Sequence, residues 1–379
     1  MGFFAKLHIL WIALVVISLS FFTYLRTFLF SDQLIIPVLG VEAKAISANM
    51  VPSPVVKVGQ PKKEWTLENI FENQTNAVAD IVSSETTDRI VLITTGDVIP
   101  ARTVNHISTN KNNFKWAFEN IAPLLKSADI TFINMETPLI KNCPLTDEGF
   151  IFCGDERHSE GLLYSGVDVV NYANNHMSNY GVEGIDNTKN ILDSVGILSV
   201  GLSSGPVYKT VKGVSFAFLA YNSLGVPEPL LSYADKEKMK REISAADNAA
   251  DIVVVGMQWG EEYTTQITSL QKELAHLAVD SGADLVIGNH PHWIQPAEIY
   301  KSGVILYAHG NLIFDQMWSL ETRQGILAGF IFKGKELADV VFIPVLIEGY
   351  GQPRILEGSG REKILNKFYE DSRKFKLSM

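Results

Sequence analysis

The chain has 379 residues, of which 46% are hydrophobic and 20% charged, and its formal net charge at pH 7 is −10. This composition is that of a globular protein with one large domain or two small ones. The chain lacks the basic stripe with interleaved aromatic residues that a nucleic-acid-binding protein needs, which argues against that class.

Residues 1–30 carry a membrane signal. No Asp, Glu, Lys or Arg occurs over residues 7–25, and such a run is about long enough for one membrane-spanning helix. We expect an uncleaved N-terminal transmembrane anchor in the cell membrane, with the main domain outside the cytoplasm. A cleaved signal peptide is the alternative, with Val41-Glu42-Ala43 as a distant cleavage site. Residues 31–87 are expected to be a juxtamembrane linker with one short helix near residues 67–82.

From residue 88 the chain alternates apolar runs with helical stretches. This alternation predicts one α/β sandwich domain over residues 88–350. Strands are expected at residues 89–94, 130–134, 167–172, 214–221, 252–257, 285–287, 304–308, 326–332 and 340–346, and helices at residues 114–125, 181–195, 234–247 and 267–280. Residues 351–379 form a lysine-rich tail, in which we expect a solvated helix at residues 363–376.

The two cysteines, Cys143 and Cys153, flank a polar segment that contains glycine. Spacing alone leaves two free thiols and a disulfide as equal alternatives. A domain outside the cytoplasm lies in an oxidising compartment, which favours a local disulfide. We therefore predict that the two cysteines are bonded.

Polar side chains follow most of the expected strands at the point where each strand ends. They are Asp97 with Arg102, Glu136, Asn175 with His176, Gln258, the pair His290 and His292, and His309. In α/β sheets ligands bind outside the carboxyl ends of the strands, so these side chains are expected to face one cleft. Taken singly, each has a simpler explanation, such as a turn, a surface position or, for His309, a satisfied core histidine. Carboxylate, amide and imidazole groups together suit a divalent metal.

The segment His290-Pro291-His292 is the strongest of these signals. Proline fixes one φ angle and favours extended backbone before it. On extended backbone, residues two apart point to the same side. The segment therefore predicts two imidazoles that converge at the end of a strand, as half of a metal site.

The ordered motifs resemble those of the CapA family, the capsule and poly-γ-glutamate biosynthesis proteins within the calcineurin-like metallophosphatase superfamily. The motifs are Gly96-Asp97 with Arg102, Asn134-Met135-Glu136-Thr137-Pro138-Leu139, Ala173-Asn174-Asn175-His176, Trp259-Gly260-Glu261-Glu262-Tyr263, Gly288-Asn289-His290-Pro291-His292 and Gly310-Asn311 with Phe314-Asp315. The resemblance implies a four-layer αββα sandwich with a metal site at the strand ends. It also implies an N-terminal membrane anchor and an outward-facing domain.

The resemblance implies a role for each site residue. Asp97, Asn175, His290 and His292 would be metal ligands, Glu136 a bridging carboxylate, and His176 would face the substrate oxyanion, with Arg102 and Asn175 as further catalytic residues. Two positions depart from the superfamily, since Ile99 and Gln258 stand where histidines are usual. An amide oxygen can bind a hard cation, but more weakly than imidazole binds zinc or iron. One cation, or none, is therefore an alternative to a two-metal centre, and Mn, Fe, Zn and Mg are not distinguished.

Three functions remain open from the sequence. The first is a membrane-anchored part of capsule or poly-γ-glutamate synthesis or export, working with other membrane subunits on an anionic polymer. The second is a metal-dependent hydrolase of phosphoester or γ-glutamyl amide bonds outside the cytoplasm. The third is a metal-free binding domain, for which Gln258 is the main argument.

Overall fold

The computed structural model describes residues 64–72, 74–82 and 88–378. The membrane span expected at residues 7–25 lies outside them. Within the described residues, no helix combines the length and the apolar character needed to cross a bilayer.

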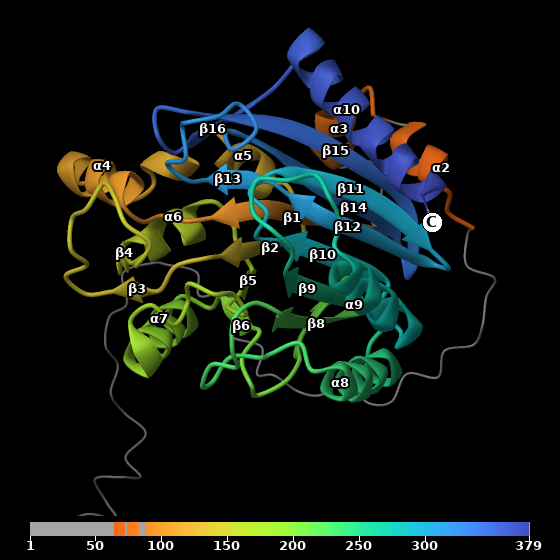
Figure 1. Cartoon of the computed structure of the whole chain (residues 1–379), viewed down its shortest axis with the longest axis horizontal. Helices are drawn as coiled ribbons and strands as arrows, with labels where there is room; N and C mark the ends of the chain where they lie inside the picture. The colour runs from red at the N-terminus through yellow and green to blue at the C-terminus, as the bar shows by residue number, and fades with distance from the viewer. Residues whose placement is uncertain (1–63, 73, 83–87, 379) are drawn as a thin grey trace, which may run out of the picture. The chain divides into compact units, whose positions relative to one another are not determined.

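The larger sheet has eight strands in the order β16-β15-β14-β1-β2-β5-β6, with β13 beside β1 (Figure 1). Its strands are β1 (Arg89–Val98), β2 (Ile130–Met135), β5 (Val169–Asn171), β6 (Leu198–Val200), β13 (Asn311–Ile313), β14 (Gln324–Lys333), β15 (Glu336–Glu348) and β16 (Gln352–Ile355). Strands β1, β2, β5 and β6 are parallel to one another and β13 is parallel to β1, whereas β14 is antiparallel to β1.

The second sheet has six strands in the order β11-β12-β10-β9-β8-β7. They are β7 (Val207–Val211), β8 (Val214–Asn222), β9 (Ile252–Gln258), β10 (Leu285–Asn289), β11 (Ile294–Tyr300) and β12 (Gly303–His309). Strands β8, β9, β10 and β12 are parallel. A third, small sheet pairs β3 (Leu139–Ile140) with β4 (Gly154–Asp155).

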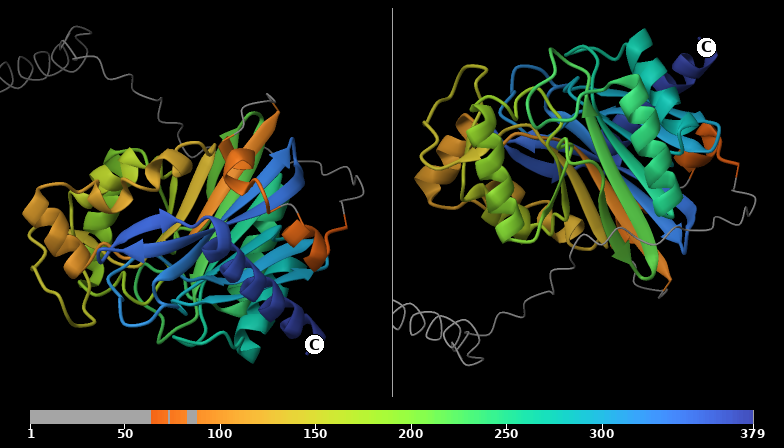
Figure 2. Two further views of the ribbon diagram at one scale, coloured as in Figure 1. Left: turned by 90° about the horizontal axis from the view of Figure 1, so that it is seen from above. Right: turned by 90° about the horizontal axis from the view of Figure 1, so that it is seen from below.

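The two large sheets pack face to face, and helices cover their outer faces (Figure 2). Between the sheets, Phe132 of β2 stacks on Phe218 of β8 with ring centroids 5.8 Å apart. The other face of the second sheet is covered by α8 (Lys236–Ala249) and α9 (Ser269–Asp280). The other face of the larger sheet is covered chiefly by α3 (Ala77–Val82), η1 (Trp116–Phe118), α5 (Ala122–Leu125), α6 (His158–Tyr164) and α7 (Gly181–Ser194), and α4 (Thr103–Lys111) follows β1. The sequence of layers is helix, sheet, sheet, helix.

Two of the expected helices are each divided in two in the structure, and a third, the C-terminal helix, differs in its burial. The helix at residues 114–125 is two short helices, because Pro123 lies in the first turn of α5 and starts a new helix. The single helix near residues 67–82 is also two, α2 (Leu67–Glu72) and α3, and both bury apolar side chains against the sheets. The end of the expected linker is thus part of the folded body.

The C-terminal helix is not the solvated helix that its lysines suggest. Helix α10 (Gly358–Leu377) buries Ile364, Leu365 and Phe368 in the core between the sheets. It packs on β11, the edge strand of the second sheet, and on β15 of the larger sheet. Its lysines are exposed to solvent. The prediction of a solvated helix, made from these charges alone, was therefore wrong, because it overlooked the apolar residues that form a buried stripe along the helix.

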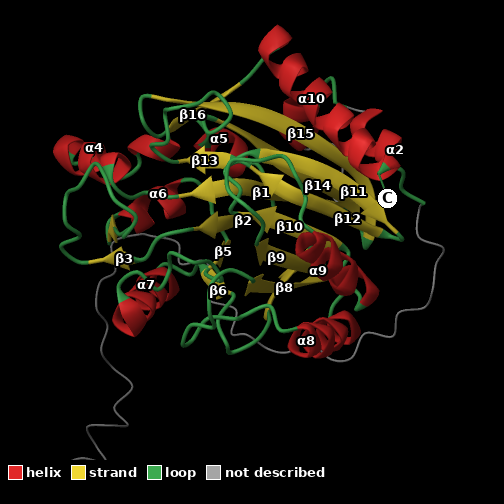
Figure 3. Cartoon of the chain, in the orientation of Figure 1, coloured by secondary structure: helices red, strands yellow, loops and turns green. Residues whose placement is uncertain are grey.

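The carboxyl ends of the parallel strands in both sheets point the same way. In Figure 3 the arrowheads of β1, β2, β5 and β10 all lead into loops on one side of the sandwich. The side chains that follow these strands can therefore meet, as the topology rule predicts.

Candidate metal centre

Three side chains from three strand ends converge at this edge. Asp97 lies near the end of β1, Glu136 follows β2, and His292 follows β10. Each offers a ligand atom, and the three atoms lie within 4.8 Å of one another. All three side chains are buried, and His292 Nδ1 is 3.0 Å from Asp97 Oδ2.

Two buried carboxylate oxygens of the centre accept no well-aligned hydrogen bond. Among the described residues these are Asp97 Oδ2 and Glu136 Oε2, although His292 Nδ1 lies 3.0 Å from Asp97 Oδ2. The Nδ1 hydrogen of His292 points instead to Asn311 Oδ1, at 2.9 Å. The Asn311 amide is held in that orientation because its nitrogen donates to the Thr322 carbonyl oxygen at 2.8 Å. His292 therefore carries a proton on Nδ1, so Nε2 is the nitrogen that a cation would take after displacing the second proton of the ring, and the donor set fits a divalent metal.

Two buried carboxylates side by side are costly without positive charge. Burial and the charge of Asp97 raise the pKa of Glu136 well above its usual range. Burial alone would also raise the pKa of Asp97, but the contact with His292 outweighs it and lowers that pKa. A bound cation would stabilise both carboxylates in their ionised forms, so that Glu136 would not need to hold a proton.

The backbone at the two histidines is not extended, contrary to the expectation from Pro291. The φ angles of His290 and His292 are 99° and 58°. Strand β10 ends at Asn289 and β11 begins at Ile294, so the chain must turn within this segment. Positive φ at a residue other than glycine costs on the order of 1–3 kcal/mol and is frequent at functional sites. The rings still lie close, with centroids 6.0 Å apart.

His290 is part of the centre but has no close partner. Its Nδ1 lies 3.9 Å from Glu136 Oε1 and accepts no hydrogen bond from the described residues. Burial and the neighbouring His292 lower its pKa to about 4, so the ring is neutral at pH 7. A neutral imidazole nitrogen is available to a cation or a substrate.

Asn175 and Gln258 also belong to the centre. Gln258, the last residue of β9, donates from Nε2 to Glu136 Oε1 and to Asn175 Oδ1, the latter at 2.9 Å. The expected residues Asp97, Glu136, Asn175, Gln258, His290 and His292 are thus brought together by the fold, although they come from distant parts of the sequence.

His176 and Arg102 lie beside this group and meet at Phe152. The His176 ring stacks on Phe152 with centroids 4.2 Å apart. The Arg102 guanidinium lies 5.1 Å from the Phe152 ring centroid and 4.8 Å from that of Phe314, and it pairs with Asp315. The charge of Arg102 is thus matched by Asp315, and its guanidinium packs against the ring on which His176 stacks.

The predicted disulfide between Cys143 and Cys153 is confirmed, with 5.8 Å between the two Cα atoms. It closes the loop between β3 and β4, next to Phe152. The bond therefore supports the ring on which His176 stacks.

Sequence reasoning missed the amide side chains that orient the ligands. Asn134 donates to Asp97 Oδ1 at 2.9 Å, and Asn311 accepts from His292. Both stand within the motifs, but nothing local distinguishes an orienting amide from a turn residue. His309 contacts Thr94 Oγ1 at 3.0 Å and the Gly288 carbonyl at 3.3 Å, and is a satisfied core histidine.

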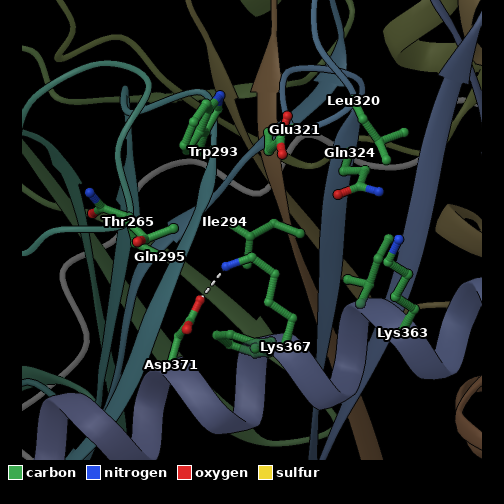
Figure 4. A pocket seen from close by; sticks show the side chains of 12 residues that line it. Thr265, Trp293, Ile294, Gln295, Leu320, Glu321, Gln324, Lys363, Lys367 and Asp371 are labelled. Atoms are coloured by element: carbon green, nitrogen blue, oxygen red, sulfur yellow. Dashed lines mark hydrogen bonds and ion pairs between the residues drawn. The ribbon is translucent and has the colours of Figure 1, made fainter.

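A cavity of about 240 Å³ lies beside the centre rather than at it (Figure 4). Its wall includes Trp293 and Ile294, the residues after His292, but none of the candidate ligands. Lys367 and Asp371 of α10 pair with each other along this wall. Because Lys367 and Asp371 neutralise each other and no candidate ligand lines the cavity, we assign the chemistry to the buried centre.

Comparison with known proteins identifies relatives over most of the chain. The family model described as bacterial capsule synthesis protein PGA_cap matches residues 91–316, which contain every candidate ligand. The capsule biosynthesis protein CapA of Bacillus anthracis is 26% identical over 370 residues, covering 92% of this chain and 88% of that protein. The PGA biosynthesis protein CapA of Bacillus subtilis is 30% identical over 295 residues, covering 73% of this chain and 77% of that protein.

A solved structure described as a novel phosphatase from Mycoplasma pneumoniae is a more distant match. It has a TM-score of 0.48 and 15% sequence identity, and the match covers 70% of this chain and 95% of that one. A likeness this low adds nothing about activity.

Proposed function

The chain belongs to the bacterial capsule synthesis protein family PGA_cap, and from this membership we propose that it works at the cell membrane in making or exporting an anionic polymer such as poly-γ-glutamate. The proposal includes an N-terminal anchor at residues 7–25, an extracytoplasmic domain and other membrane subunits as partners. The uncharged N-terminal run and the disulfide support this placement.

We propose further that the domain acts through a metallophosphatase-like centre at Asp97, Glu136 and His292. The observation that carries this proposal is the pair of buried carboxylate oxygens that accept no well-aligned hydrogen bond, beside the imidazole of His292, whose Nδ1 hydrogen points to Asn311. A divalent cation held there would polarise a phosphoryl or acyl oxygen and lower the pKa of water. Since the chain has a net charge of −10, the cation would also supply the local positive charge that an anionic substrate needs.

His176 is suited to move a proton in such a reaction. Asn179 Oδ1 accepts the Phe152 N–H at 2.7 Å, so it presents an oxygen to His176 Nδ1 at 3.1 Å. His176 therefore holds its proton on Nδ1, and burial lowers its pKa to about 4. At neutral pH its Nε2 is therefore unprotonated and can accept a hydrogen bond from the water or from a hydroxyl of the substrate.

The variant Asp97→Asn tests the proposal, because it removes the charge of one ligand and keeps its shape. Asp168→Asn is the matched control, since Asp168 accepts the Thr131 N–H at 2.9 Å and belongs to no site. In polymer-producing cells, Asp97→Asn should abolish polymer output at an unchanged protein level, whereas the control should not. Normal output from the Asp97→Asn cells would count against the centre.

Assays of the purified protein distinguish a hydrolase from a non-hydrolytic component of synthesis or export. Hydrolysis of a chromogenic phosphodiester or a γ-glutamyl peptide with Mn²⁺, lost in Asp97→Asn, would establish a hydrolase. Loss of polymer without any hydrolysis would favour a non-hydrolytic part in synthesis or export. If the wild type binds no cation and both variants produce polymer, the domain is a metal-free binding domain.

A further inference from the structure

The amide group of Gln258 is held in one orientation by a relay of amide side chains. The relay starts at the backbone, where the Ala173 N–H donates to Asn171 Oδ1 at 2.8 Å. Asn171 Nδ2 then donates to Asn134 Oδ1 at 3.0 Å. Asn134 Nδ2 donates to Asp97 Oδ1 at 2.9 Å and to Gln258 Oε1 at 3.1 Å. Because each step fixes the next, Gln258 turns its oxygen toward Asn134 and its nitrogen into the centre.

In this orientation Gln258 uses both of its hydrogens on candidate ligands. Nε2 donates to Glu136 Oε1 and to Asn175 Oδ1, the latter at 2.9 Å. A second cation would need these same two oxygens as ligands. The amide nitrogen therefore occupies the place at which such a cation would bind them.

The two sides of the centre differ in whether their acceptor oxygens already receive a hydrogen bond. On the side of Asp97 and His292, the acceptors Asp97 Oδ2 and Glu136 Oε2 accept no well-aligned hydrogen bond from the described residues. On the side of Gln258, the acceptors Glu136 Oε1 and Asn175 Oδ1 both have one. The first pair of acceptors is therefore available to a cation, whereas the second pair is already occupied by the donors of Gln258.

Gln258 cannot easily become a ligand itself. To present Oε1 to a cation, its amide would have to turn over and break its hydrogen bonds to Asn134, Glu136 and Asn175. The turned amide would also place its nitrogen against the nitrogen of Asn134, two donors with no acceptor between them.

We propose that Gln258 closes the second cation position and that the centre holds a single divalent cation, bound by Asp97, Glu136 and His292. The proposal rests on the cation centre proposed above and specifies its stoichiometry. His290, whose Nδ1 has no partner among the described residues, is then left to contact the substrate or its water.

The test is the metal content of Gln258→His, measured by elemental analysis after equilibration with Mn²⁺ and removal of excess ion. The wild type should bind one ion per chain and Gln258→His two. Electron paramagnetic resonance gives a second readout, because two neighbouring Mn²⁺ ions couple and lose the six-line spectrum of an isolated ion. Gln295→His is the matched control, since Gln295 is also buried but bonds to Gln271 and to the Thr264 and Gln266 carbonyls. It should bind one ion.

If Gln258→His does not fold, Gln258→Ala serves in its place, because it removes the two donors and leaves space. It should admit a second ion with at least tenfold weaker affinity than the first. Two ions in the wild type, or one ion in a folded Gln258→His or Gln258→Ala protein, would overturn the closure by Gln258 and leave the cation centre standing. No ion in the wild type would overturn both.

Discussion

Replacing Asn311 by Leu should weaken cation binding without touching a ligand. Asn311 Oδ1 accepts the Nδ1 hydrogen of His292 at 2.9 Å, and its own amide is anchored on the Thr322 carbonyl at 2.8 Å. This pair of contacts fixes the ring orientation and keeps a proton on Nδ1, so Nε2 is the nitrogen that a cation would take. Leucine has nearly the same size but offers no acceptor, so the ring loses its partner.

The structure suggests the size of two separate effects. Loss of a partner behind a metal-binding histidine typically costs 10–100-fold in metal affinity, which corresponds to about 1.4–2.8 kcal/mol of binding free energy. The substitution also leaves the buried Thr322 carbonyl oxygen without its donor, which should cost about 1–3 kcal/mol of unfolding free energy.

A matched variant, Asn105→Leu, separates these effects. Asn105 is also buried and also faces a buried histidine, with Oδ1 3.1 Å from His158 Nε2. It contacts none of the candidate ligands, so its loss should lower stability by a similar amount and leave affinity unchanged. Mn²⁺ affinity by calorimetry and stability by urea unfolding are the two measurements. Equal affinities in the two variants would refute the assignment of His292 as an oriented ligand.

Three further predictions follow from the disulfide, from the ionisation of the centre and from the N-terminal run. Cys143→Ser with Cys153→Ser should lower the unfolding free energy by about 2–3 kcal/mol, because the bond closes a short loop, and an unchanged urea midpoint would contradict this. Burial would lower the pKa of His292, but contact with Asp97 raises it to about 9 from 6.5. A cation must expel that proton, so Mn²⁺ affinity should rise from pH 6.5 to 9, and a flat calorimetric profile would argue against binding at this residue. Protease added to intact cells should digest the domain if residues 7–25 anchor it, whereas full protection would place it inside.

The elements with strong local patterns were predictable from the sequence. Strand β9 contains three consecutive valines and β10 begins with a short apolar run, and both lie where expected. Such runs are buried on both faces in any parallel sheet with covered faces, so little tertiary information is needed to find them. The disulfide was predictable from two cysteines close in sequence taken together with the expectation that the domain lies outside the cytoplasm.

The membership of the centre was also predictable, because polar residues that follow parallel strands must meet at one edge of a sheet. This argument brought together Asp97, Glu136, Asn175, Gln258 and the two histidines without any knowledge of distances. It is a consequence of topology and needs no detail of packing.

Only the tertiary structure decided how these side chains are used. The left-handed backbone at His290 and His292 depends on the turn between β10 and β11, which overrides the local preference set by Pro291. The orientation of Gln258 depends on an amide relay whose members come from β2, β5 and β9. The burial of α10 depends on the gap at the edge of the sandwich that its apolar stripe fills. Hydrogen-bond direction and burial arise between segments far apart in the chain, so no local pattern of residues encodes them.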